Sequence, residues 1–146
     1  MNAPWSSAAS SGDDPTEADG FLEKLIDSDD QHLIVLDHPD DPTRLAAAAG
    51  LQRYPSTKTN HRAMIWGVYT TASMRRRGYA REVMRFAIDT ARQWEGLRFL
   101  ALSVSAESAG PIALYQSLGF EPWGTEPAVV HINGRDYDET YMALRL

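Results

Sequence analysis

The chain has 146 residues, 43% of them apolar and 23% charged, with a formal net charge of −6 and no cysteine. This composition predicts one globular domain large enough to fold around its own core. The lack of cysteine excludes a disulfide framework, a cysteine-built zinc site and an acyl-cysteine intermediate.

Neither the first ten residues nor any later segment looks like a targeting or membrane segment. The N-terminus has no basic segment followed by an apolar run, and no 18 apolar residues follow one another. We therefore expect a cytoplasmic protein with no membrane partner.

The charge is unevenly distributed. Residues 1–41 carry 11 acidic residues and one lysine, a net of −10, whereas residues 42–146 carry 13 basic and 9 acidic residues, a net of +4. A basic part within an acidic protein predicts a local anion site, because nucleic-acid binders usually spread positive charge more widely. We expect no nucleic-acid partner.

The N-terminal part divides into a tail and a helix. Residues 1–13 are rich in Ser, Ala and Gly and predict a flexible tail, so the domain is expected over 14–146. Asp14, Pro15 and Glu17 are typical of a helix start, and an apolar face of helical spacing follows as far as Ile26.

The next segments favour strands. Residues 32–36 form a short apolar run, and the turn residues 37–42 follow it. Four alanines within 45–54 favour helix by propensity, but a run of this length broken by Gly50 also suits a buried strand, which is the structure we expect.

A strand, a helix and a second strand then predict a crossover. Residues 63–70 and 99–104 are strand-like, and between them Val83 to Trp94 repeat apolar side chains at helical spacing before Gly96. This order predicts a right-handed βαβ unit with two parallel strands.

The C-terminal part predicts a short helix and a hairpin. The helix should begin at Pro111 and end at Leu118. Asn133-Gly134 between apolar runs predicts antiparallel strands near 125–132 and 135–145. The fold class is therefore mixed α/β.

The segment from Arg75 to Ala80 is a candidate anion site, since it joins a strand to a helix. Amides at a helix N-terminus are unpaired, a glycine permits close approach, and three arginines supply counter-charge, which together suit a pyrophosphate. The alternative is that Arg75-Arg76-Arg77 is an ordinary solvated helix cap.

Two motifs give the chain a resemblance to a known family. Arg75-x-x-Gly78-x-Ala80 resembles the acyl-CoA signature Q/R-x-x-G-x-G/A of the GNAT superfamily of acyl-CoA N-acyltransferases, and Leu114-Tyr115-x-x-x-Gly119-Phe120 is similar to its L-Y-x-x-x-G-F segment. Over about residues 31–146 the resemblance implies a twisted, mostly antiparallel sheet with one parallel βαβ crossover and helices on both faces. It also implies that the first strand and helix of a complete member are absent.

The resemblance implies acetyl-CoA as acyl donor and a set of contacts to it. Val68 and Thr70 would offer main-chain groups to the pantetheine arm, and Ser108 stands where the family often has a cofactor-binding Asn. Tyr115 would also lie against the cofactor. The pyrophosphate would be wrapped by Arg75, Arg76, Arg77, Gly78, Tyr79 and Ala80.

Acyl transfer to an amine needs a neutral amine, a stabilised oxyanion and a proton for the leaving thiolate. Tyr115 matches the family's general acid, since a phenol titrates near ~10 and a thiol near ~8.5. The amide near Thr70 is expected to polarise the thioester carbonyl.

The general base is open. Relatives that acetylate ribosomal-protein N-termini place a glutamate on the fifth strand, where this chain has Ser103. The candidates are His61, because imidazole titrates near neutrality, and Asp138 or Glu139, which could also attract a cationic amine. Deprotonation through ordered water is an equal alternative.

The expected function is therefore an acetyl-CoA-dependent N-acetyltransferase, acting by direct attack in a ternary complex on an amine of a small molecule, peptide or protein. The alternative is an acyl-CoA-binding regulatory module without turnover. We expect no metal, because neither the four histidines nor the carboxylates show ligand spacing. A homodimer would compensate for a shortened N-terminus.

Overall fold

The computed structural model describes residues 30–146. The tail expected over 1–13 and the helix expected to open at Asp14 lie outside the described residues, as does any element that would precede β1. Within the described part, no helix combines the length and apolarity needed to span a membrane.

The first two strands form an antiparallel pair, β1 (Gln31–His38) with β2 (Asp41–Arg53). The alanine-rich segment is a strand, as expected, because β2 lies between two neighbours and residues 46–51 are all buried. Tertiary pairing thus overrides the helical propensity of alanine.

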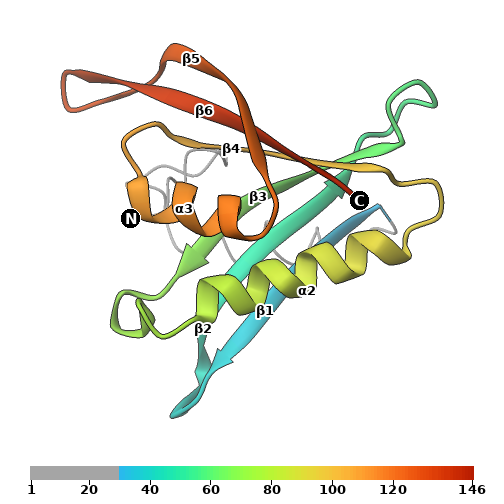
Figure 1. Ribbon diagram of the computed structural model, residues 1–146. Coiled ribbons are helices and arrows are strands. Elements are labelled where there is room, and N and C mark those ends of the chain that lie inside the picture. Colours follow the sequence, from blue (N-terminus) through green and yellow to red (C-terminus); the bar gives the residue numbers. More distant parts are fainter. Residues whose placement is uncertain (1–29) are drawn as a thin grey trace.

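The predicted crossover is confirmed. β3 (Arg62–Thr70) leads into α2 (Tyr79–Gln93) and then into β4 (Phe99–Ser105), which pairs parallel to β3. Figure 1 shows α2 lying across β1, β2 and β3. Its helical apolar face is buried against them: Val83, Met84, Ala87, Ile88 and Ala91.

The C-terminal part contains α3 (Ala109–Ser117) and a hairpin of β5 (Glu121–Ile132) and β6 (Arg135–Arg145). The helix begins at Ala109, two residues before the predicted start at Pro111. Proline is tolerated as its third residue because the amides of the first turn have no acceptor within the helix, so the missing N–H costs no hydrogen bond. Positive φ angles at Asn133 (52°) and Gly134 (76°) confirm the expected tight turn. β5 also begins earlier than predicted.

The six strands form one mixed sheet in the order β1-β2-β3-β4-β6-β5, and only β3 and β4 are parallel. This is the expected fold class. One core of apolar side chains from β2, β3, β4, β6 and both described helices holds the sheet and helices together.

The parallel pair separates soon after it starts. β3 and β4 are paired only from Arg62 with Phe99 to Met64 with Ala101, although β3 continues to Thr70 and β4 to Ser105. Beyond Met64 in β3 and Ala101 in β4 the two strands are no longer hydrogen-bonded to each other, and the space between these carboxyl-terminal parts is called the gap below.

A bulge in β3 accompanies this separation. Between the pairs Ala48 with Tyr69 and Gly50 with Trp66, one residue of β2 lies opposite two of β3, Gly67 and Val68. The extra residue falls beside Gly67, whose φ of 59° is left-handed and therefore suits glycine. The bulge bends the end of β3 that leads to the candidate site.

Candidate active site

The loop between β3 and α2 is attached to β2 by hydrogen bonds at its first residue. The Thr71 amide donates to the Ala46 carbonyl at 2.9 Å, and the Thr71 hydroxyl donates to the Leu45 carbonyl. A short 3-10 turn, η2 (Ala72–Met74), follows. These bonds fix the start of the loop, directly after β3, to β2.

The N-terminus of α2 presents free amides. Gly78 is the N-cap with φ 85°, a left-handed conformation that only glycine adopts without strain. The first helical bond runs from the Glu82 amide to the Gly78 carbonyl at 3.0 Å, so the amides of residues 79–81 have no acceptor within the helix. A Cβ at Gly78 would meet no atom of residues 30–146 within 4 Å, so these residues leave room for a ligand there.

Arg76 is also left-handed, with φ 63°. For a residue with a side chain this backbone costs about 1–2 kcal/mol. Strain of this kind is concentrated at binding and catalytic sites, where the surrounding structure maintains it.

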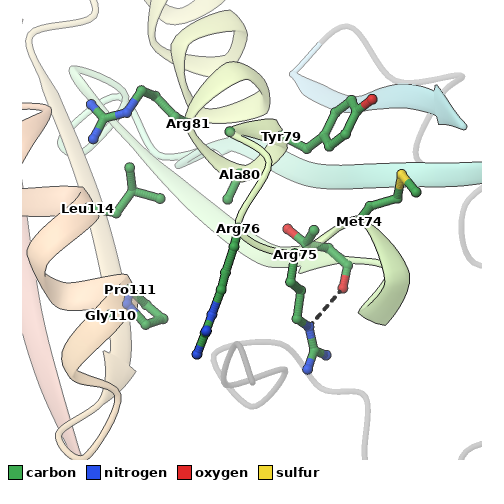
Figure 2. Close-up of a pocket in the computed structure, with 11 residues that line it drawn as sticks. Met74, Arg75, Arg76, Tyr79, Ala80, Arg81, Gly110, Pro111 and Leu114 are labelled. Atoms are coloured by element: carbon green, nitrogen blue, oxygen red, sulfur yellow. Dashed lines mark hydrogen bonds between the residues drawn. The ribbon is translucent and has the colours of Figure 1, made fainter. Parts of the chain in front are cut away.

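A cavity of about 340 Å³ opens at this helix end. Figure 2 shows its walls, formed by the loop before α2, the first turn of α2 and the first turns of α3. Its lining residues are Thr70, Met74, Arg75, Arg76, Gly78, Tyr79, Ala80, Arg81, Gly110, Pro111 and Leu114. This volume lies within the range of small-ligand pockets.

The cavity is positively charged. Among residues 30–146 its lining includes Arg75, Arg76 and Arg81 and no carboxylate. Arg75 donates from Nε to the Thr70 carbonyl at 3.4 Å, as the dashed line in Figure 2 shows. The ion pairs found within residues 30–146 involve none of these arginines. Guanidinium groups beside the first amides of a helix are the kind of groups that bind phosphate-type anions in proteins.

The structure brings together most of the residues expected to hold the cofactor. Thr70, Arg75, Arg76, Gly78, Tyr79 and Ala80 all line the cavity. The other four lie outside its lining. Val68 and Tyr115 are buried, Arg77 is exposed, and Ser108 is the N-cap of α3, two residues before Gly110.

Sequence analysis missed five lining residues, Met74, Arg81, Gly110, Pro111 and Leu114. Arg81 directly follows the motif, on the first turn of α2. Its charge and position could have predicted that it lines the cavity. The α3 residues carry no such signal, because their place opposite the arginines depends on how the two helices pack.

Thr70 ends β3 beside the gap. Its hydroxyl is buried and has no hydrogen-bond partner within residues 30–146, although the residue lines the cavity. An unsatisfied hydroxyl at a cavity wall is available to a bound ligand.

Tyr115 is buried in the core, with 4% of its surface exposed, and its ring meets Phe120 edge-on at 6.2 Å between centroids. Burial raises the pKa of the Tyr115 phenol. The hydroxyl therefore keeps its proton at neutral pH and can act as a hydrogen-bond donor, but full transfer to a thiolate is further uphill than the ordinary pKa values imply.

The three candidate bases lie in different places. His61 precedes β3 and its ring meets Phe99 at 6.3 Å, so the whole nine-residue strand, about 30 Å at ~3.3 Å per residue, separates it from the cavity at Thr70. The Asp138 carboxylate accepts the Ala128 amide at 2.9 Å.

Glu139 is the buried candidate. It lies on β6 opposite Ser105, the last residue of β4, and only 3% of its surface is exposed. Burial raises the pKa of its carboxyl, Ser103 opposes this shift by hydrogen bonding, and Glu126 adds to it by repulsion. A carboxyl with a raised pKa opposite the end of β4 is a stronger base than an exposed one.

Among residues 30–146 no group of three or more His, Cys, Asp or Glu side chains could hold a metal ion.

Comparisons with known proteins assign the family. The sequence profile described as Acetyltransferase (GNAT) family matches residues 2–120, whereas no curated protein matches the sequence significantly.

Several solved structures share the fold. The ribosomal-protein-alanine N-acetyltransferase of Brucella melitensis is 25% identical with a TM-score of 0.78, covering 92% of this chain and 80% of that one. A GNAT acetyltransferase of Streptococcus pneumoniae is 21% identical with a TM-score of 0.78, covering 90% and 76%. A spermidine N-acetyltransferase of Vibrio cholerae is 21% identical with a TM-score of 0.72, covering 89% and 74%. With its profile match over most of the sequence, this chain belongs to the acetyltransferase (GNAT) family.

Proposed function

We propose that this protein transfers an acetyl group from acetyl-CoA to a primary amine by direct attack in a ternary complex. The observation that carries the proposal is the arginine-lined cavity at the N-terminus of α2, placed beside the gap between β3 and β4. Family membership supports the reaction class, and the lack of cysteine leaves direct transfer as the route.

Donor binding uses the features of the α2 end. The free amides of residues 79–81 and the guanidinium groups of Arg75, Arg76 and Arg81 match a pyrophosphate. From there the pantetheine arm would follow the open edge of β3, where the main chain of Val68 and Thr70 is free of β4. The thioester would then lie in the gap.

The amine acceptor must lose its proton before it attacks the thioester carbon. We assign Glu139 as the proton acceptor, since it alone of the candidates is a buried carboxyl beside the end of β4. The amine nitrogen then forms the new bond to carbon, and the bond from carbon to sulfur breaks. The Thr70 amide polarises the carbonyl, and the Tyr115 hydroxyl donates to the leaving thiolate.

The names of similar structures support an amine acceptor. The Brucella protein is named for the alanine of a ribosomal protein and the Vibrio protein for spermidine, and both are named as N-acetyltransferases.

Thiol release from acetyl-CoA across a panel of amines tests the proposal. Wild-type protein should release thiol in the presence of at least one amine, and Tyr115→Phe should lower kcat by about 10²-fold or more, since it removes only the hydroxyl. Tyr54→Phe is the matched control, because Tyr54 lies at the far end of the sheet against Arg62. Binding of acetyl-CoA without transfer to any amine would identify the protein as an acyl-CoA-binding module instead.

A further inference from the structure

A pair of carboxylates lies on the face of the sheet opposite the core. Glu126 of β5 is directly opposite Glu139 of β6, which in turn is opposite Ser105 of β4. Core residues such as Leu102 and Met142 alternate with these positions and point to the other face. Directly opposite side chains start about 4.5–5.5 Å apart at Cβ, so the two acids share one small region.

Glu139 is the unusual member of this pair. It is almost completely buried, yet its Oε1 atom has no hydrogen-bond partner among the residues that the structure describes. An unsatisfied buried carboxylate oxygen is costly, so it points to a ligand that supplies the missing donor.

Glu126 has a different environment. It is exposed, and it accepts a hydrogen bond from the Tyr141 hydroxyl. That bond raises the pKa of Tyr141 to about 12, so the phenol remains a donor. The Tyr141 ring stacks on Trp123 with centroids 5.3 Å apart, and Trp123 is 67% exposed. A carboxylate beside exposed aromatic faces is a typical binding site for an organic ammonium ion.

The two acids have no basic partner in the described part of the chain. None of the ion pairs found within residues 30–146 includes Glu126 or Glu139. The two carboxylates repel each other, and no basic side chain of the described residues offsets their negative charge. A cationic ligand could therefore neutralise it.

We propose that the acceptor is a diammonium compound, in which Glu139 faces the amine to be acetylated while Glu126, Tyr141 and Trp123 bind a second amine that stays charged. The reason is chemical. The reacting nitrogen must be neutral when it attacks, so a compound with one amine keeps no charge for the second carboxylate, whereas a diamine keeps one. This inference rests on the proposed acetyl transfer for the role of Glu139, but the Glu126 subsite can be tested by binding alone.

The test compares two acceptors of equal length, 1,4-diaminobutane and 1-aminobutane, by thiol release from acetyl-CoA. Wild-type kcat/KM should favour the diamine by about 10- to 100-fold, the range expected for one charge-assisted hydrogen bond. Glu126→Gln should remove most of this preference, chiefly through KM. Trp123→Ala should reduce it as well. Glu121→Gln, another exposed glutamate of β5, is the matched control and should keep it.

A second measurement separates this inference from the proposed function. Calorimetric titration of 1,4-diaminobutane into protein saturated with coenzyme A should show binding that Glu126→Gln weakens and Glu121→Gln does not. Such binding without turnover of any amine would support the subsite and overturn the proposed transfer. Turnover with equal kcat/KM for both acceptors would overturn the diammonium subsite while leaving the transferase intact.

Discussion

At the scale of single residues, the environment of Glu139 should lower the free energy of unfolding of the protein at neutral pH. Its carboxyl is buried, one oxygen has no donor in the described part of the chain, and burial together with repulsion from Glu126 raises its pKa. Ionisation in the folded state is therefore harder than in the unfolded chain, where a glutamate titrates near 4.5. The group that we assign to proton transfer should lower the stability of the ligand-free protein at neutral pH.

Glu139→Gln tests this linkage. Below pH 4.5 the carboxyl is neutral in both states, so its ionisation costs nothing. As the pH rises through the raised folded-state pKa, the native protein binds more protons than the unfolded chain, and the free energy of unfolding of the wild type falls. The variant lacks this loss, so its melting temperature relative to wild type should increase between pH 4 and pH 8.

The control for this series is Glu121→Gln, which removes an exposed carboxyl from β5. Its melting temperature should follow that of the wild type at every pH. A stability difference for Glu139→Gln that does not change between pH 4 and pH 8 would contradict the assigned pKa shift.

At the scale of elements, the β2–β3 pairing depends on a glycine. Gly50 lies opposite Trp66, and a Cβ at Gly50 would come within 2.1 Å of the indole Cε2. Gly50→Ala must therefore displace the Trp66 ring, at a cost of about 1–3 kcal/mol for overpacking. Thermal unfolding should show a melting temperature several degrees lower.

Gly124→Ala is the matched control for that change. Gly124 also lies in a strand, has no positive φ, and would place its Cβ in open space. It should leave the melting temperature within about one degree of wild type, because surface substitutions usually change stability little. An unchanged melting temperature for Gly50→Ala would show that Trp66 does not need this space.

A second prediction at this scale concerns the contribution of the loop before α2 to acetyl-CoA affinity. Arg76 lines the cavity in a strained backbone conformation, whereas Arg92 lies in the last turn of α2 and pairs with Asp89 at 3.6 Å. Arg76→Gln should weaken acetyl-CoA binding about 10-fold, the effect of losing one charged contact to phosphate, and calorimetry measures it. Arg92→Gln should change the affinity little. Equal losses in both variants would mean that only the general charge of the helix matters.

At the scale of the whole molecule, the gap lies between β3 and β4, which are paired in register at only three positions. A ligand that contacts the α2 end and β3 as well as α3 should therefore stabilise the entire fold. Coenzyme A at 100 times its dissociation constant should add about 2.7 kcal/mol and raise the melting temperature by several degrees.

Pantetheine is the control for that shift, since it carries the thiol arm without the pyrophosphate. At the same concentration it should raise the melting temperature much less. A shift as large as that of coenzyme A would show that the arginine-lined cavity contributes little to binding.

Much of this architecture could be predicted because its signals are local. Apolar spacing indicated α2, the Asn133-Gly134 turn indicated the hairpin, and the Arg75–Ala80 motif indicated where the arginine-lined cavity lies. The separation of β3 from β4 could not be predicted, because it depends on how far two distant segments stay in register. For the same reason the position of Glu126 opposite Glu139, and the burial of Tyr115, became visible only in the folded chain.

A crystal structure with coenzyme A bound tests the central claim most directly. The pyrophosphate should lie within hydrogen-bond distance of the amides of residues 79–81, with Arg76 beside it. The sulfur should lie in the gap between β3 and β4, facing the Tyr115 hydroxyl and the Glu139 carboxylate. Coenzyme A bound away from the N-terminus of α2, or with its sulfur outside the gap, would contradict the account.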